Sequence, residues 1–143
     1  MDIVKEILVD APASKVYAAF TDAREMAGWW CKDAQLGSVP GDVNKLRFNK
    51  DGQIVDMQFR IVELTPESHL VWSCVENTFA PWVDTAFCVD ITPEGENARV
   101  RLTHSGWDAD KFGREVIDNV SGGWDHFLQS LTTYCKTGVG AAI

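Results

Sequence analysis

The stretch ARVRLTHSGWDADKFGREVIDNVSGGWDHFLQSL, residues 98–131, changes its hydrophobic period partway along. From Val100 to His104 alternate residues share one face, as in a β-strand whose side chains point to opposite sides of a sheet. After Trp107 apolar residues recur at helical spacing and continue almost to Gly138. The pattern predicts a strand and then a helix of about 25 residues, roughly 38 Å long, which is enough to cross a whole sheet.

The middle of this predicted helix contains two adjacent glycines. Asp108 or Asp110 can cap its start. Its apolar positions are Phe112, Val116, Ile117, Val120, Trp124, Phe127, Leu128, Leu131 and Cys135. Gly122 and Gly123 interrupt this stripe, and each costs about 1 kcal/mol relative to alanine in a helix interior. We therefore expect either a break in the helix or close packing that compensates the cost.

Upstream of the helix, period-two segments alternate with turn residues. The predicted strands are residues 43–48, 54–63, 69–75, 83–91 and 98–105, and residues 36–39 are a candidate for a further short strand. The short gaps between them predict antiparallel hairpins. Residues 4–9 predict a first strand, and Pro12 suits the first turn of a following helix at 13–20. A second short helix is expected to end near Ala27. Helices at both ends of a run of antiparallel strands indicate the α+β fold class.

Length, charge and apolar stretches limit the number of domains and the classes of partner that we expect. The chain has 143 residues and 15.9 kDa, which predicts one domain spanning residues 1–143. Its net charge of -8 and pI of about 4.7 disfavour nucleic acid and anionic membrane surfaces. The N-terminus lacks the basic and apolar regions of a signal peptide, and no apolar stretch reaches the ~20 residues of a membrane helix. We predict a cytoplasmic protein without nucleic-acid partners or membrane insertion.

Cysteine and histidine spacing indicates no metal site. The four cysteines are Cys31, Cys74, Cys88 and Cys135. They form no C-x-x-C motif and have no histidine at ligand spacing, so we predict reduced thiols, no metal and no cofactor. His69 lies beside a turn and is expected to be a solvent-exposed residue at the start of a strand.

Several segments taken together resemble one known family. These are Val9–Tyr17, Phe20–Asp22, Gly28–Trp30, Leu102–Trp107, and Gly122–Leu131 with Tyr134 and Gly138. They are similar to the family named after the activator of heat-shock protein 90 ATPase homologue, within the START/Bet v 1-like (SRPBCC) superfamily. The resemblance covers nearly the whole chain. It implies the helix-grip fold, in which a curved antiparallel sheet wraps around a long C-terminal helix, with two short N-terminal helices.

The same resemblance implies an apolar cavity between sheet and helix, which in many relatives holds a hydrophobic small molecule. Six tryptophans and seven phenylalanines against two tyrosines agree with an aromatic-lined pocket. The candidate ligand-binding residues are Trp30, Phe59, Trp72, Glu76, Phe87, Leu102, His104, Phe112, Val116, Val120, Trp124 and Phe127. Of the adjacent Trp29 and Trp30, we expect one to fill the junction between short helices and sheet and the other to line the pocket.

Two polar members of this set carry alternative interpretations. His104 is expected on the inward face, either as a hydrogen-bonded structural imidazole or as a ligand contact or general base. Glu76 follows Trp72 and Cys74 at period two. It is a buried acid if the strand continues inward, and a solvent-exposed residue if the strand ends first.

Relatives on this fold include lipid binders, polyketide cyclases and co-chaperone domains, so the fold implies no single activity. We favour binding of a hydrophobic small molecule without established catalysis. One alternative is a cyclase- or hydrolase-type enzyme that uses His104 and Glu76 as acid and base. Another is a stress-related or co-chaperone-like interaction module. The apolar loop Phe79–Trp82 is a candidate for a lid over the pocket or for a homodimer contact.

Overall fold

A computed structural model describes residues 2–143 and places seven strands in one antiparallel sheet. The strands are β1 (Ile3–Val9), β2 (Asp33–Gln35), β3 (Val43–Lys50), β4 (Gln53–Thr65), β5 (His69–Asn77), β6 (Ala86–Glu94) and β7 (Asn97–Ser105). Their order across the sheet is β1-β7-β6-β5-β4-β3-β2. Strands β2 to β7 are therefore consecutive neighbours, as short connections favour, and β1 joins the sheet beside β7.

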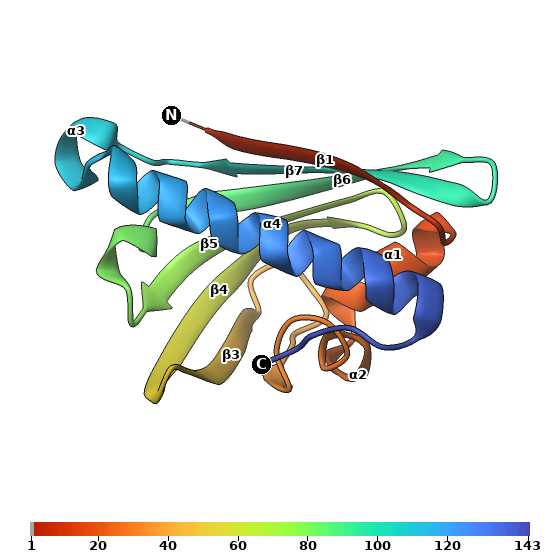
Figure 1. The fold of residues 1–143 in the computed structure, drawn as a ribbon, viewed down its shortest axis with the longest axis horizontal. Coiled ribbons are helices and arrows are strands. Elements are labelled where there is room, and N and C mark those ends of the chain that lie inside the picture. Colours follow the sequence, from red (N-terminus) through yellow and green to blue (C-terminus); the bar gives the residue numbers. More distant parts are fainter. Residues whose placement is uncertain (1) are drawn as a thin grey trace.

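A long helix covers one face of this sheet (Figure 1). The helices are α1 (Ala13–Thr21), α2 (Ala23–Met26), the 3-10 helix η1 (Ala80–Trp82), α3 (Ala109–Phe112) and α4 (Arg114–Thr137). Helix α4 begins near the η1 loop and ends beside α1 and α2 (Figure 1). The predicted α+β helix-grip architecture is confirmed.

Register on the inner face follows the alternation seen in the sequence. Phe87 pairs with His104, and Val89 pairs with Leu102. All four side chains are buried beneath α4, with at most 1% of their surface exposed. The outward residues between them are only partly buried, so one face of the sheet is dry and the other is wet.

Two strands are displaced by three residues or more from the sequence-based expectation, and the others differ by one or two residues at their ends. Strand β6 begins at Ala86 and not at Val83, because the chain turns after η1. Asp84 adopts a left-handed φ of 71° there, and the Thr85 amide donates to the Trp82 carbonyl at 3.0 Å. The short extra strand is β2, residues 33–35, which precedes the expected segment 36–39.

The long helix is divided where its start was predicted. Asp108 caps the four-residue α3, and Gly113 at a φ of 85° separates α3 from α4. Helix α4 then runs unbroken through Gly122 and Gly123 for 24 residues. A Cβ atom added at either glycine would meet no atom within 4 Å. Both explanations expected for the glycines are wrong: the helix does not break there, and no close packing compensates them.

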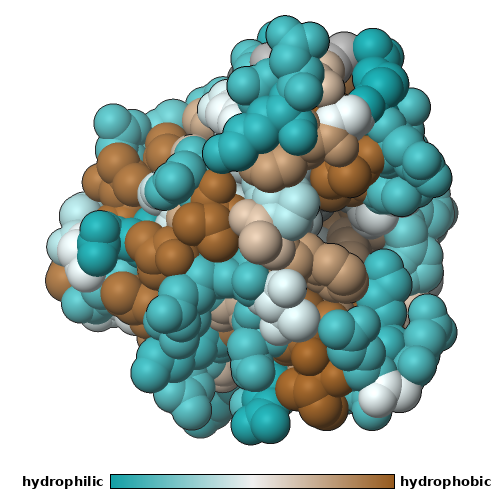
Figure 2. Space-filling view, turned by 90° about the vertical axis from the view of Figure 1, so that its left-hand side faces the viewer, coloured by the Kyte–Doolittle hydropathy of each residue, from teal (hydrophilic) through white to brown (hydrophobic). Residues whose placement is uncertain are grey.

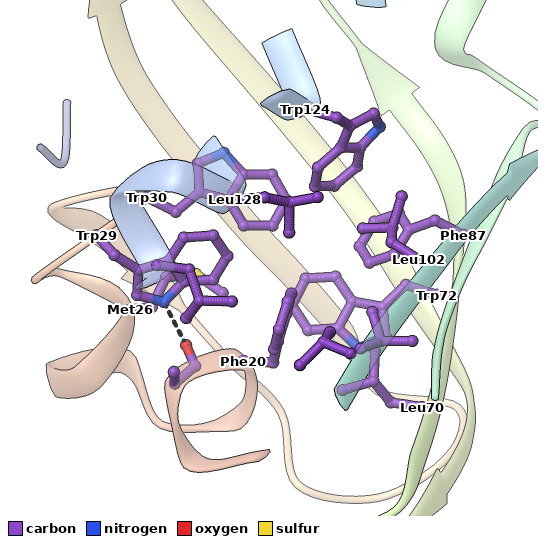
Figure 3. Close-up of a cluster of buried hydrophobic side chains, with 14 of the residues drawn as sticks. Phe20, Met26, Trp29, Trp30, Leu70, Trp72, Phe87, Leu102, Trp124 and Leu128 are labelled. Carbon is purple, nitrogen blue, oxygen red and sulfur yellow. Dashed lines mark hydrogen bonds between the residues drawn. The ribbon is translucent and has the colours of Figure 1, made fainter. Parts of the chain in front are cut away.

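The core between sheet and helix is dominated by aromatic side chains (Figure 3). Trp29 packs edge-on against Phe20 at 4.9 Å between ring centroids, and its Nε1–H donates to the Ala19 carbonyl at 2.8 Å. Trp29 therefore fills the junction between the short helices and the sheet. Trp30 points the other way, toward Trp72 and Phe87.

No helix within residues 2–143 is both long enough and apolar enough to cross a membrane.

Candidate ligand pocket

A pocket of about 730 Å³ lies between the first half of α4, the β3–β4 hairpin and the η1 loop. Its lining residues are Trp30, Phe48, Asn49, Lys50, Asp51, Met57, Phe79, Pro81, Trp82, Val116, Asn119, Val120, Gly123, Trp124, His126, Phe127 and Ile143. In Figure 2, brown side chains gather around a hollow on the side of the molecule where α4 begins. The volume falls within the range of small-molecule sites, roughly 300–1,000 Å³.

Aromatic rings form the deep wall of the pocket. Trp30 is only 1% exposed and contacts Trp124 and Phe127 of α4, with ring centroids 5.5 and 5.8 Å apart. Trp82 of η1 packs against Trp124 at 6.1 Å. Tilted contacts of this kind between aromatic rings are favourable, at about 0.5–1.5 kcal/mol each beyond the area that they bury.

A buried polar network beneath the pocket holds the ring of Trp124 and the backbone of Trp82. Trp124 Nε1–H donates to His104 Nδ1 at 3.0 Å. Because indole nitrogen is only a donor, Nδ1 must be the acceptor and Nε2 carries the proton. Nε2–H then donates to Thr85 Oγ1 at 2.8 Å, and that hydroxyl donates to the Trp82 carbonyl at 2.6 Å. His104 thus connects one wall on α4 to another on η1.

The environment keeps His104 neutral. The side chain is fully buried, and this burial lowers its pKa to about 3 by disfavouring the charged imidazolium. Both ring nitrogens are already hydrogen-bonded to Trp124 and Thr85. The structural interpretation of His104 is the one that fits: it positions pocket walls and has no free nitrogen for a substrate proton.

Polar groups lie mainly at the rim. Asn49, Lys50 and Asp51 come from the exposed end of the β3–β4 hairpin, and Asn119 and His126 are exposed on α4. Trp30 Nε1 is buried and has no hydrogen-bond partner among the described residues. A buried donor left unpaired costs roughly 1–3 kcal/mol.

The predicted site residues divide between the pocket and the core beneath it. Those that line the pocket are Trp30, Val116, Val120, Trp124 and Phe127. Those that are at most 1% exposed and pack in the core outside the pocket lining are Phe59, Trp72, Phe87, Leu102 and His104. The period-two pattern identifies the inward face but cannot say how much of that face the helix covers.

Two predicted residues lie away from the pocket. Phe112 belongs to α3, which Gly113 turns away from the line of α4, and it does not line the pocket. Glu76 is exposed and lines a separate shallow depression. A β-bulge between Gln58 and Phe59 shifts the register so that Glu76 pairs with Gln58, and the inward alternation stops at Cys74. Of the two alternatives for Glu76, the solvent-exposed one is therefore correct, and Glu76 does not pair with His104.

Sequence reasoning missed several pocket residues. Phe48 and Met57 alternate inward in β3 and β4, so their period-two position could have identified them. Ile143 had no such signal. It reaches the pocket because its amide donates to the Trp30 carbonyl and its carbonyl accepts from the Lys32 amide, both at 3.0 Å.

Solved structures share this fold across nearly the whole chain. The Aha1 dimer from Colwellia psychrerythraea superposes with a TM-score of 0.81 at 24% identity, covering 98% of this chain and 99% of that one. A protein from Staphylococcus saprophyticus gives 0.81 at 19% identity, with 100% and 98% covered. DynU16, a putative protein in the dynemicin biosynthetic locus, gives 0.76 at 20% identity, with 97% of this chain and 48% of that chain covered.

No curated protein matches the sequence significantly. The profile of the family described as activator of Hsp90 ATPase homolog 1-like protein matches residues 10–136. This match covers most of the chain, from the end of β1 to the last turn of α4. The chain therefore belongs to the family of activator of Hsp90 ATPase homolog 1-like proteins.

Proposed function

We propose that this protein binds a hydrophobic small molecule in the pocket between α4, the β3–β4 hairpin and η1. The observation that carries the proposal is the pocket itself, about 730 Å³ in volume and walled by Trp30, Trp82, Trp124 and Phe127. Apolar walls of this size favour a ligand that removes much of its own apolar surface from water.

The polar atoms of the pocket restrict the chemistry of the ligand. The deep wall is formed by aromatic rings, and Trp30 Nε1 is itself buried, so this wall favours a molecule with a largely apolar body. The rim combines Lys50 with Asp51, so it offers no single sign of charge to select a strongly ionic ligand. A neutral molecule with an aromatic or alicyclic body fits these constraints.

The polar network favours binding over acid–base catalysis. His104 is neutral, fully buried and hydrogen-bonded at both nitrogens, and Glu76 lies in a different, exposed region. The pair proposed for a cyclase or hydrolase reaction is not assembled. The His104 network instead holds Trp124 and Trp82 in place, and such preorganised walls reduce the ordering cost of binding.

Adjacent glycines offer a matched test of the pocket. Gly123 lines the pocket, whereas Gly122 is exposed on the neighbouring face of the same helix, and both have open space around them. We expect Gly123→Leu to fill part of the pocket and to weaken binding of the neutral dye Nile red at least tenfold. Gly122→Leu should bind the dye as the unchanged protein does. Fluorescence titration measures both affinities.

Equal dye affinity in the two leucine variants would contradict a site at this pocket. A second measurement uses native mass spectrometry of the protein purified from its own host. We expect an adduct that disappears on denaturation and is depleted in Gly123→Leu. Protein that carries no adduct and binds no dye would overturn the proposal.

A homodimer through the η1 loop is a second proposal. Phe79 is 43% exposed at the pocket rim, and a structure of the same fold is described as a dimer. Light scattering should give twice the mass of 15.9 kDa for the unchanged protein and the monomer mass for Phe79→Ser. A monomer mass for the unchanged protein at high concentration would contradict this.

A further inference from the structure

The outer face of the sheet, opposite α4, brings together three side chains with metal-ligand chemistry. His69 at the start of β5 pairs directly with Asp90 of β6. Cys88 lies two residues before Asp90 on the same strand, so the two side chains share a face. One donor atom from each of the three residues lies within 4.8 Å of the other two.

Their separations are close to those of a tetrahedral site. The Cys88 Sγ atom lies 3.7 Å from His69 Nδ1 and 3.5 Å from Asp90 Oδ2. Zinc bond lengths of about 2.0 Å to nitrogen or oxygen and about 2.3 Å to sulfur imply roughly 3.6 Å between sulfur and either other ligand. His69 Nδ1 lies 2.7 Å from Asp90 Oδ1, where a metal site needs roughly 3.4 Å, so a small rotation of the carboxylate suffices.

We propose that His69, Cys88 and Asp90 form a binding site for a divalent transition metal ion, with Zn²⁺ as the best match to one nitrogen, one sulfur and one oxygen ligand. Imidazole and thiolate select zinc-like ions over Mg²⁺ or Ca²⁺, which take oxygen ligands. Three protein ligands leave a fourth position for water. The site is accessible, because 27% of the His69 side chain and 49% of the Asp90 side chain are exposed.

Glu63 of β4 completes the arrangement as a positioning residue. Its carboxylate lies 2.7 Å from His69 Nε2, the ring nitrogen that faces away from Cys88. A metal-bound histidine commonly donates its other N–H to a carboxylate, which fixes the ring orientation and the tautomer. Glu63 can therefore hold His69 with Nδ1 directed at the ion.

Metal binding releases two protons to solvent, that of the Cys88 thiol and that of His69 Nδ1, which donates to Asp90 Oδ1 at 2.7 Å before the ion enters. The sulfur–metal and nitrogen–metal bonds then replace the two bonds to hydrogen. Burial, followed by the negative charge of Asp90, raises the pKa of this thiol to about 11. The metal-free thiol is thus protonated at neutral pH, and the ion supplies the charge that stabilises the thiolate.

Titration of the full-length protein with Co²⁺ tests the site, since Co²⁺ reports both geometry and thiolate ligation by its absorption. We expect one equivalent to produce tetrahedral visible bands and a sulfur-to-cobalt charge-transfer band, and Zn²⁺ to abolish both. Cys88→Ser should lose the charge-transfer band and bind at least tenfold more weakly. Cys135→Ser is the matched control, because Cys135 is another partly buried thiol, and it should retain the full signal.

Two further variants separate ligation from general structure. His69→Asn should lose most of the affinity, while Glu63→Gln should weaken binding by about 10–100-fold and keep the charge-transfer band at saturation. Circular dichroism checks that each variant is folded. A charge-transfer band that persists in Cys88→Ser, or no saturable binding by the unchanged protein, would overturn the proposal. This result does not depend on the pocket, which lies on the other face of the sheet.

Discussion

The two ends of α4 pack against the same sheet in opposite ways. In its C-terminal half Leu128, Leu131 and Tyr134 are buried, with at most 9% of their surface exposed. In its N-terminal half Val116 and Val120 are only partly buried and line the pocket. One helix therefore anchors the core at one end and forms a cavity wall at the other.

The difference comes from what lies between helix and sheet. At the C-terminal end, Phe20 of α1 and Trp29, which follows α2, pack into the core, and Ser130 Oγ–H donates to the Trp29 carbonyl at 2.7 Å. At the other end, the η1 loop and the β3–β4 hairpin border an open pocket beside the helix, and Gly123 adds no side chain to fill it. A full core stabilises the fold, and the open end leaves volume for a ligand.

The largest expected effect is a large-to-small substitution at the full end. Leu131→Ala should lower the free energy of unfolding by about 2–5 kcal/mol, because a fully buried side chain leaves a cavity. Val120→Ala at the pocket should cost about 1 kcal/mol or less, since its side chain already borders open volume. Urea unfolding measures both. Similar losses would mean that the two ends do not differ in packing.

The pH dependence of the free energy of unfolding tests the His104 network beneath the pocket. Because the folded pKa of His104 is about 3 and the unfolded value about 6.5, the unfolded state binds the proton first as pH falls. Stability should therefore fall with decreasing pH below about 6.5, by about 1.4 kcal/mol per unit from this group. The free energy of unfolding of the unchanged protein and of His104→Gln is measured from pH 6.5 to 5. The difference between the two slopes against pH gives the contribution of His104.

His104→Gln should also lose roughly 1–3 kcal/mol at neutral pH, since Trp124 Nε1 or Thr85 loses its partner. Parallel stability curves for the two proteins below pH 6.5 would show that His104 is not held neutral.

The same Gly→Ala change should have opposite signs at the two ends. At Gly28 the added Cβ would lie 2.1 Å from Tyr134 Cε1, and that ring is held by the hydrogen bond of its hydroxyl to Glu25. We expect Gly28→Ala to destabilise the protein by about 1–3 kcal/mol through overpacking. Thermal unfolding followed by circular dichroism gives the sign. A neutral result would indicate that Tyr134 moves aside at no cost.

The smallest effect is expected at the pocket glycine. Gly123→Ala should stabilise the protein by up to about 1 kcal/mol, because alanine is the better helix former and its Cβ meets open space. Gly122→Ala should give a similar gain and serves as the solvent-facing control. Thermal unfolding of the two variants in parallel tests this. If Gly123→Ala alone destabilised the protein, the space beside Gly123 would be too small for a methyl group, and the pocket would not be open there.

Much of the fold was predictable from local pattern. The strands after residue 43 and the helix to Thr137 follow from hydrophobic period, and that period depends on neighbours within a few residues. Five pocket residues, Trp30 among them, were predicted from the same pattern and the family resemblance. Single-domain organisation of residues 1–143 and a cytoplasmic location stay predictions.

The features that the sequence did not predict depend on contacts between residues that are distant along the chain. Glu76 turned outward because β5 has an extra residue, Val75, between the pairs Phe59–Cys74 and Gln58–Glu76. This bulge is defined by pairing with β4, which the alternation within β5 does not report. His69 and Cys88 are 19 residues apart and meet only through pairing of β5 with β6. Spacing rules along the sequence therefore do not identify the metal site that we propose there.

By itself, the sequence determined which side chains face inward, where hairpins turn and where the chain becomes helical, because these depend on short-range periodicity and turn chemistry. Only the tertiary structure decided how that inner face is divided between a full core and a pocket. It also decided which outward residues meet across strands. Both depend on register and on the volume left after distant elements pack, as the open space beside Gly123 shows.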